Sequence, residues 1–81
     1  MDTEPELVFS PLSRTVTRDG RSVEVHIYRG EPDRWILEAV DEFQNSTVWD
    51  DQFATDQQAL DELLRTIAAE GIGSLIGPPP T

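Results

Sequence analysis

The chain has 81 residues, of which 37% are hydrophobic and 27% are charged, and its formal net charge is −10. This length suits one small domain, whose core is close to the lower limit for stability without support. The chain contains no cysteine, which excludes disulfide bonds, thiolate nucleophiles and zinc–thiolate sites. The acidic charge disfavours binding to nucleic-acid phosphates and to anionic lipids.

The two ends of the sequence set the expected domain organisation. The acidic start MDTEPE differs from the basic start of a signal peptide, and no apolar run approaches the roughly 20 residues of a membrane span. We therefore expect a cytoplasmic protein. We expect residues 1–10 to form either a flexible tail or an edge strand, residues 11–77 a single α+β domain, and residues 78–81 a proline tail.

A β-hairpin is predicted around Asp19-Gly20, a residue pair that suits the centre of a type I′ turn. A two-residue loop at this point pairs Val16 with Val23 and Leu12 with Ile27. The alternation of side chains then predicts a core face made of Leu12, Val16, Val23, Val25 and Ile27. The opposite face of the hairpin carries Thr15, Thr17, Glu24, His26 and Tyr28.

Two further strands are expected after a turn at residues 29–33. Residues 34–41 have apolar side chains on both faces, which is typical of a central strand. One face of this strand carries Trp35, Leu37 and Ala39, and the other carries Ile36, Glu38 and Val40; the sequence leaves open which of them the helix covers. A turn at residues 42–45 leads to a fourth strand, for which two registers remain open: one pairs Ala39 with Val48, the other pairs Val40 with Trp49. We expect Phe53 to lie in the core.

A helix over residues 55–70 is the clearest element of the sequence. Thr55 and Gln58 have the spacing of a capping box, and Gly71 is placed to end the helix in a left-handed conformation. At 100° per residue one apolar face is predicted to contain Leu60, Leu63, Leu64 and Ile67. After the helix, the expected core contacts are Ile72, Leu75 and Ile76.

These elements predict an α+β fold, an antiparallel meander of three to four strands packed on one face by a single helix in the C-terminal half. The runs WILEAVD, STVW and FATDQQAL, within residues 34–64, resemble the sheet-to-helix segment of AP2 and integrase-type DNA-binding domains. This resemblance implies a three-stranded sheet backed by a helix, and it concerns the fold only. The wider pattern, from V-x-I-Y-R through W-x-L-E-x-V-D to T-D-x-x-A-L and E-G-I, also resembles small acidic bacterial proteins of unknown function.

The sheet face away from the helix is the candidate interaction surface. An exposed aromatic patch among charges is typical of a contact surface, and the candidate residues are Glu24, His26, Tyr28, Trp35 and Trp49. The alternative for the two tryptophans is that they anchor the core. No serine nucleophile motif accompanies the single histidine. The acidic residues also lack the spacing of a calcium loop. We therefore expect no catalytic, metal or cofactor site.

The leading hypothesis is a non-enzymatic protein-interaction module. It would bind another protein, or a second copy of itself, through the sheet face or edge that the helix leaves uncovered. One alternative is an acidic inhibitor or decoy that binds the basic surface of a nucleic-acid-binding protein. A third hypothesis, nucleic-acid binding through an AP2-like sheet, is disfavoured by the charge.

Overall fold

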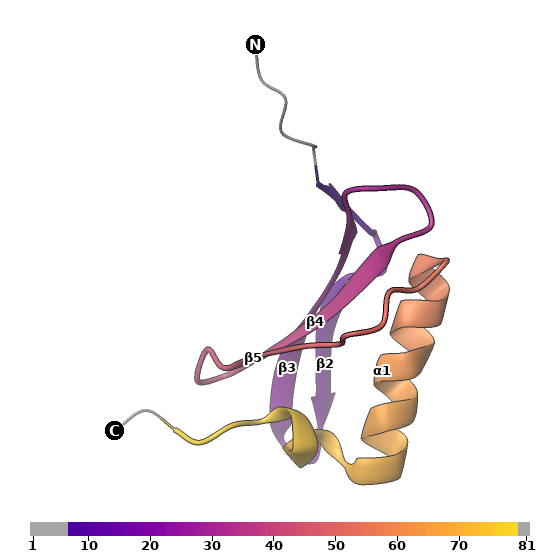
Figure 1. The fold of residues 1–81 in the computed structure, drawn as a ribbon. Helices are drawn as coiled ribbons and strands as arrows, with labels where there is room; N and C mark the ends of the chain where they lie inside the picture. The colour runs from indigo at the N-terminus through magenta and orange to yellow at the C-terminus, as the bar shows by residue number, and fades with distance from the viewer. Residues whose placement is uncertain (1–6, 80–81) are drawn as a thin grey trace.

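The computed structural model describes residues 7–79 and shows an α+β fold (Figure 1). Within this range an antiparallel sheet of five strands is followed by a single α-helix and a short 3-10 helix. The elements are β1 (Val8–Phe9), β2 (Arg14–Arg18), β3 (Arg21–Arg29), β4 (Trp35–Asp41), β5 (Ser46–Val48), α1 (Asp56–Glu70) and η1 (Ile72–Leu75). The predicted fold class is confirmed, whereas the predictions for residues 1–6 and 80–81 lie outside the described residues.

Strand β3 lies at the centre of the sheet. One edge of β3 pairs with two strands, β1 at one end of β3 and β2 at its other end. The second edge of β3 pairs with β4, and β4 in turn pairs with β5. Residues 8–9 thus form the edge strand that was one of two expectations for the N-terminal segment. This strand brings the sheet to five strands instead of three or four. Within residues 7–79, no helix has the length and apolar content needed to cross a membrane.

The β2–β3 hairpin has the predicted turn and register. Asp19 and Gly20 both have positive φ, 54° and 75°, as a type I′ turn requires. Val16 lies opposite Val23. The predicted pairing of Leu12 with Ile27 is wrong, because the ladder is interrupted before β2. There the side-chain oxygen of Ser13 accepts a hydrogen bond of 3.0 Å from the backbone N–H of Ile27.

The β4–β5 connection has neither of the two expected registers. Glu38 lies opposite Val48 and Val40 lies opposite Ser46. The turn is one residue shorter than a four-residue loop, because the N–H of Asp41 donates to the carbonyl of Asn45 at 2.9 Å. Gln44, with a φ of 68°, supplies the positive-φ residue that three-residue hairpin loops contain.

The carboxylate of Asp41 determines this turn. Its Oδ1 accepts hydrogen bonds of 2.8 Å from the N–H groups of Phe43 and Asn45. Its Oδ2 accepts one of 2.7 Å from the N–H of Gly77, near the C-terminal end of the described chain. Burial by itself would raise the pKa of Asp41, but the hydrogen bonds from Gly77, Asn45 and Phe43 outweigh it and hold the pKa below its ordinary value.

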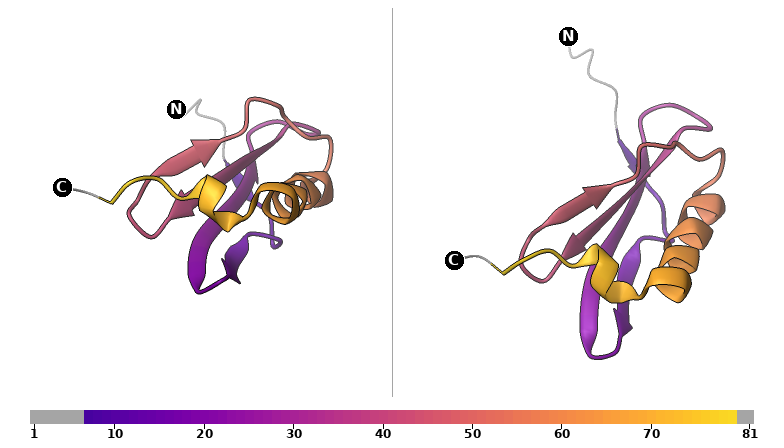
Figure 2. Two further views of the ribbon diagram at one scale, coloured as in Figure 1. Left: turned by 90° about the horizontal axis from the view of Figure 1, so that it is seen from below. Right: turned by 60° about the horizontal axis from the view of Figure 1, so that its bottom comes forward.

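The core lies between the sheet and the two helices, which cover the same face (Figure 2). The buried apolar residues are Val16, Val23, Val25, Ile27, Leu37, Ala39, Ala59, Leu60, Leu63, Ile67, Ile72 and Leu75. Leu12, Phe53 and Ile76 pack against this cluster and are partly buried. The core prediction therefore holds for most of its members, from the hairpin strands, the helix and the segment after it, and the structure adds Leu37 and Ala39 of β4.

The helix begins as predicted, because the side-chain oxygen of Thr55 accepts a hydrogen bond of 3.1 Å from the N–H of Gln58. The buried face of the helix is rotated about the helix axis relative to the predicted face. Leu64 is 36% exposed, and Thr66 is buried in its place with its hydroxyl donating to the carbonyl of Glu62. Gly71 has the expected positive φ of 83°, but its ψ of 154° is extended and not left-handed helical.

Candidate functional site

The candidate site is the sheet face opposite α1 and η1, which we call the open face. No described element packs on it (Figures 1 and 2). Strand alternation places every second residue there, and strand pairing arranges these residues in rows across the sheet. The first row is Phe9, Tyr28 and Ile36; the second is His26, Glu38 and Val48; the third is Thr15, Glu24, Val40 and Ser46; the fourth is Thr17 and Ser22.

Apolar and aromatic side chains dominate the first row. The rings of Phe9 and Tyr28 lie 5.5 Å apart between centroids and are tilted by 42°. The side chain of Phe9 is nevertheless 58% exposed, and Leu7 beside this row is 55% exposed. In the second row Val48 is 52% exposed. Apolar side chains with this exposure, gathered on one face, are typical of a contact surface.

Glu38 occupies the middle of the open face and is half-buried. Its carboxylate accepts one hydrogen bond from the hydroxyl of Tyr28, at 3.5 Å, and one from the hydroxyl of Ser46. Both donors are neutral, and in the described part of the chain no arginine lies within ion-pair distance of this carboxylate. The side chain is thus oriented by neutral groups while its charge is uncompensated.

The remaining polar residues of the open face surround Glu38. His26 lies directly opposite Glu38, and its Nε2 lies 3.5 Å from a carboxylate oxygen of Glu24. Burial raises the pKa of Tyr28, and the negative charge and hydrogen bond of Glu38 raise it further. The phenol therefore stays a neutral hydrogen-bond donor at physiological pH.

Three of the five predicted interaction residues lie together on the open face: Glu24, His26 and Tyr28. The two tryptophans do not. Trp35 and Trp49 are partly buried and pack against the core on the helix side, where the guanidinium of Arg29 lies 5.2 Å from the Trp35 ring centroid. Both registers considered for the fourth strand place Trp49 on the open face. The observed register differs by an odd number of residues and therefore turns Trp49 inward and Val48 outward.

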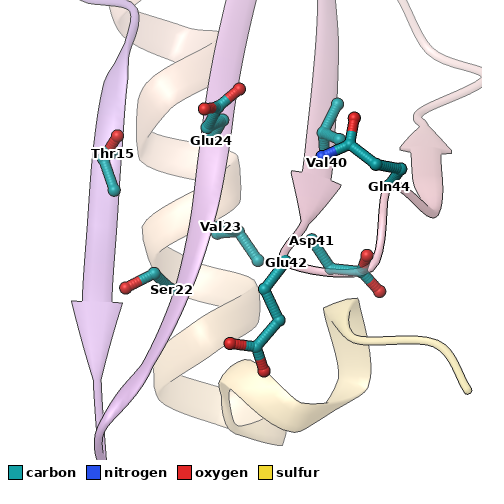
Figure 3. A pocket seen from close by; sticks show the side chains of 8 residues that line it. All are labelled: Thr15, Ser22, Val23, Glu24, Val40, Asp41, Glu42 and Gln44. Atoms are coloured by element: carbon teal, nitrogen blue, oxygen red, sulfur yellow. The ribbon is translucent and has the colours of Figure 1, made fainter. Parts of the chain in front are cut away.

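A shallow hollow of about 190 Å³ lies at the hairpin end of the open face (Figure 3). In this view α1 lies behind the strands, and the carboxylates of Glu24 and Glu42 point in different directions. Glu42 is engaged by Arg21, with 3.3 Å between Nε and Oε1. Among residues 7–79 no three histidine or acidic side chains come together as a metal site. The hollow continues the open face toward the turn of the β2–β3 hairpin and is lined by both apolar and polar side chains.

Comparisons with protein-family models, with curated proteins and with solved structures find no match for this chain.

The site contains residues that were not among the sequence candidates: Phe9, Ile36, Glu38, Val40 and Val48. Alternation along residues 34–41 groups Ile36, Glu38 and Val40 on one face of that strand, and the pairing of β4 with β3 shows that this is the open face. Phe9 and Val48 join the site only through the pairing of β1 with β3 and through the observed β4–β5 register. Neither pairing follows from local sequence patterns.

Proposed function

We propose that the chain is a non-enzymatic protein-interaction module and that the open face is its binding surface. The single observation that carries this proposal is the exposed apolar first row beside the uncompensated carboxylate of Glu38. Binding to such a face lowers the free energy, because the partner removes the apolar side chains of the face from water. It also offers oriented polar groups that select the partner.

The chemistry of the open face supports binding better than catalysis. A nucleophile needs a general base within hydrogen-bond reach. On this face His26 contacts Glu24, whereas the hydroxyls of Ser46 and Tyr28 both donate to Glu38. The histidine and the hydroxyls are thus engaged by different carboxylates. This division suits a rigid recognition surface.

Site-specific photo-crosslinking tests the proposed function. A photoreactive benzoylphenylalanine replaces Val48, which is 52% exposed on the open face. A matched variant carries the same group at Ala69, which is exposed on α1. Each variant is irradiated in a lysate of the source cells, and the adducts are resolved by mass spectrometry.

We expect discrete adducts from position 48 and several-fold fewer from position 69. The adducts from position 48 should also decrease when Tyr28→Ala is added, because this substitution removes part of the first row. Equal yields from both positions, or no adduct from position 48, would contradict the use of the open face for binding.

A further inference from the structure

Resting on the proposed function, we infer that the partner of the open face is a protein segment with a basic and an apolar side chain about 7 Å apart. The basic side chain, arginine or lysine, binds the carboxylate of Glu38, and the apolar side chain packs on the first row. The inference depends on three features of the open face: the hydrogen bonding of Glu38, the charges of its rows, and the spacing of these rows.

The hydrogen bonding of Glu38 leaves acceptor capacity for a cation. Each carboxylate oxygen has two lone pairs, and the hydroxyls of Tyr28 and Ser46 use one on each oxygen. The bond from Ser46 also restricts the orientation of the side chain, so less conformational entropy is lost when a partner binds. An arginine can bind such a carboxylate through two parallel N–H groups.

The charges of the rows favour a basic partner over a second copy of the chain. The open face carries Glu24 and Glu38, and no row residue is an arginine or lysine. Two open faces in contact would bring these carboxylates together, within molecules that each carry a net charge of −10. Juxtaposed like charges oppose such a pairing, whereas a basic segment compensates them.

The spacing of the rows defines the sequence pattern of the partner. Tyr28 and His26, like Ile36 and Glu38, are two positions apart on their strands, so the first and second rows are separated by about 7 Å. An extended segment presents side chains on one face at this same interval. The matching pattern therefore has an apolar residue two positions from a basic one.

A titration with synthetic peptides tests this inference on the full chain. The probe is the capped peptide Leu-Ser-Arg-Ser-Leu-Ser-Arg, which places leucine and arginine two positions apart. One control replaces both arginines with glutamate, and a second replaces both leucines with serine. Binding is followed by amide chemical-shift changes, because these report both the affinity and the location of a weak complex.

We expect the probe to shift amides of β1, β3 and β4, and the glutamate peptide to shift none. Glu38→Gln should weaken binding about tenfold, whereas the charge-matched Glu70→Gln on α1 should weaken it less than about twofold. Phe9→Ser tests the apolar row with a side chain that is already exposed, so that folding is retained. Leu64→Ser on the helix is its control.

Equal weakening by Glu38→Gln and Glu70→Gln would overturn the inference, because the peptide would then respond only to overall charge. Binding of the glutamate peptide, shifts confined to α1, or concentration-dependent dimerisation in sedimentation experiments would also overturn it. The photo-crosslinking result separates this outcome from the proposed function. Adducts at position 48 without peptide binding would retain the open face as a binding surface and reject the basic partner.

Discussion

At the scale of single residues, two glycines differ in backbone conformation but have the same free space around them. Gly20 in the hairpin turn has a φ of +75°, and a Cβ added there would meet no atom within 4 Å. Gly73 in η1 has the same free space, but its φ is not positive. A methyl group at either position therefore tests the backbone requirement alone.

Gly20→Ala should lower the free energy of unfolding by about 1–2 kcal/mol, the cost of a left-handed conformation for an L-residue. Gly73→Ala should leave stability almost unchanged or raise it slightly. Chemical denaturation monitored by circular dichroism measures both. Equal effects of the two substitutions would show that the turn does not depend on the positive φ of Gly20.

At the scale of elements, the helix shows where sequence patterns lose precision. Leu63 and Leu64 are neighbours that both fall within the predicted apolar face, yet Leu63 is fully buried and Leu64 is 36% exposed. Caps and periodicity are local properties, so they place the helix ends correctly. The rotation of the helix depends on how it packs on β3 and β4, which is a tertiary property.

Leu63→Ala should destabilise the protein by about 2–5 kcal/mol, because it leaves a cavity in the core. Leu64→Ala removes the same atoms from a partly solvated position and should cost less than about 1.5 kcal/mol. Thermal and urea denaturation of both variants provide the comparison. Similar losses from the two leucines would indicate a helix rotated to the predicted orientation.

Strand pairing shows the same division between local and distant causes. The Asp19-Gly20 turn determines the β2–β3 register through adjacent residues, and the prediction is correct there. The β4–β5 register depends on Asp41, whose carboxylate is also bonded to Gly77, 36 positions away. No short sequence pattern reports that bond. This one register decides whether Trp49 or Val48 faces outward, and it brings Ser46 to Glu38.

At the scale of the whole molecule, Asp41 connects the sheet to the C-terminal segment. Besides the bond to Gly77, the side chain of Asn45 donates to Asp41 and to the carbonyl of Pro78, both at 3.0 Å. Because folding lowers the pKa of Asp41 below its ordinary value of 3.8, the folded protein binds fewer protons here than the unfolded chain. The resulting stabilisation is complete above this value and is lost as the pH falls through the lowered pKa.

Asp41→Asn should therefore lower the melting temperature at neutral pH. The difference from the wild type should shrink as the pH falls below 3.8, the ordinary pKa of the residue. Circular dichroism melts over a pH series measure this difference. Asp50→Asn removes the same charge from an exposed residue and serves as the control. A melting difference that is constant with pH would contradict the role assigned to the Asp41 carboxylate.

The helices that cover one face of the sheet come last in the sequence, so this face is uncovered while the chain is being synthesised. The residues that cover the core face, from Ala59 to Leu75, all follow the last strand in the sequence. During synthesis the sheet can pair first, and its core side chains Val23, Val25, Ile27 and Leu37 then stay exposed to water. A nascent chain that stalls before residue 59 would thus present two apolar surfaces, one of which the finished protein conceals.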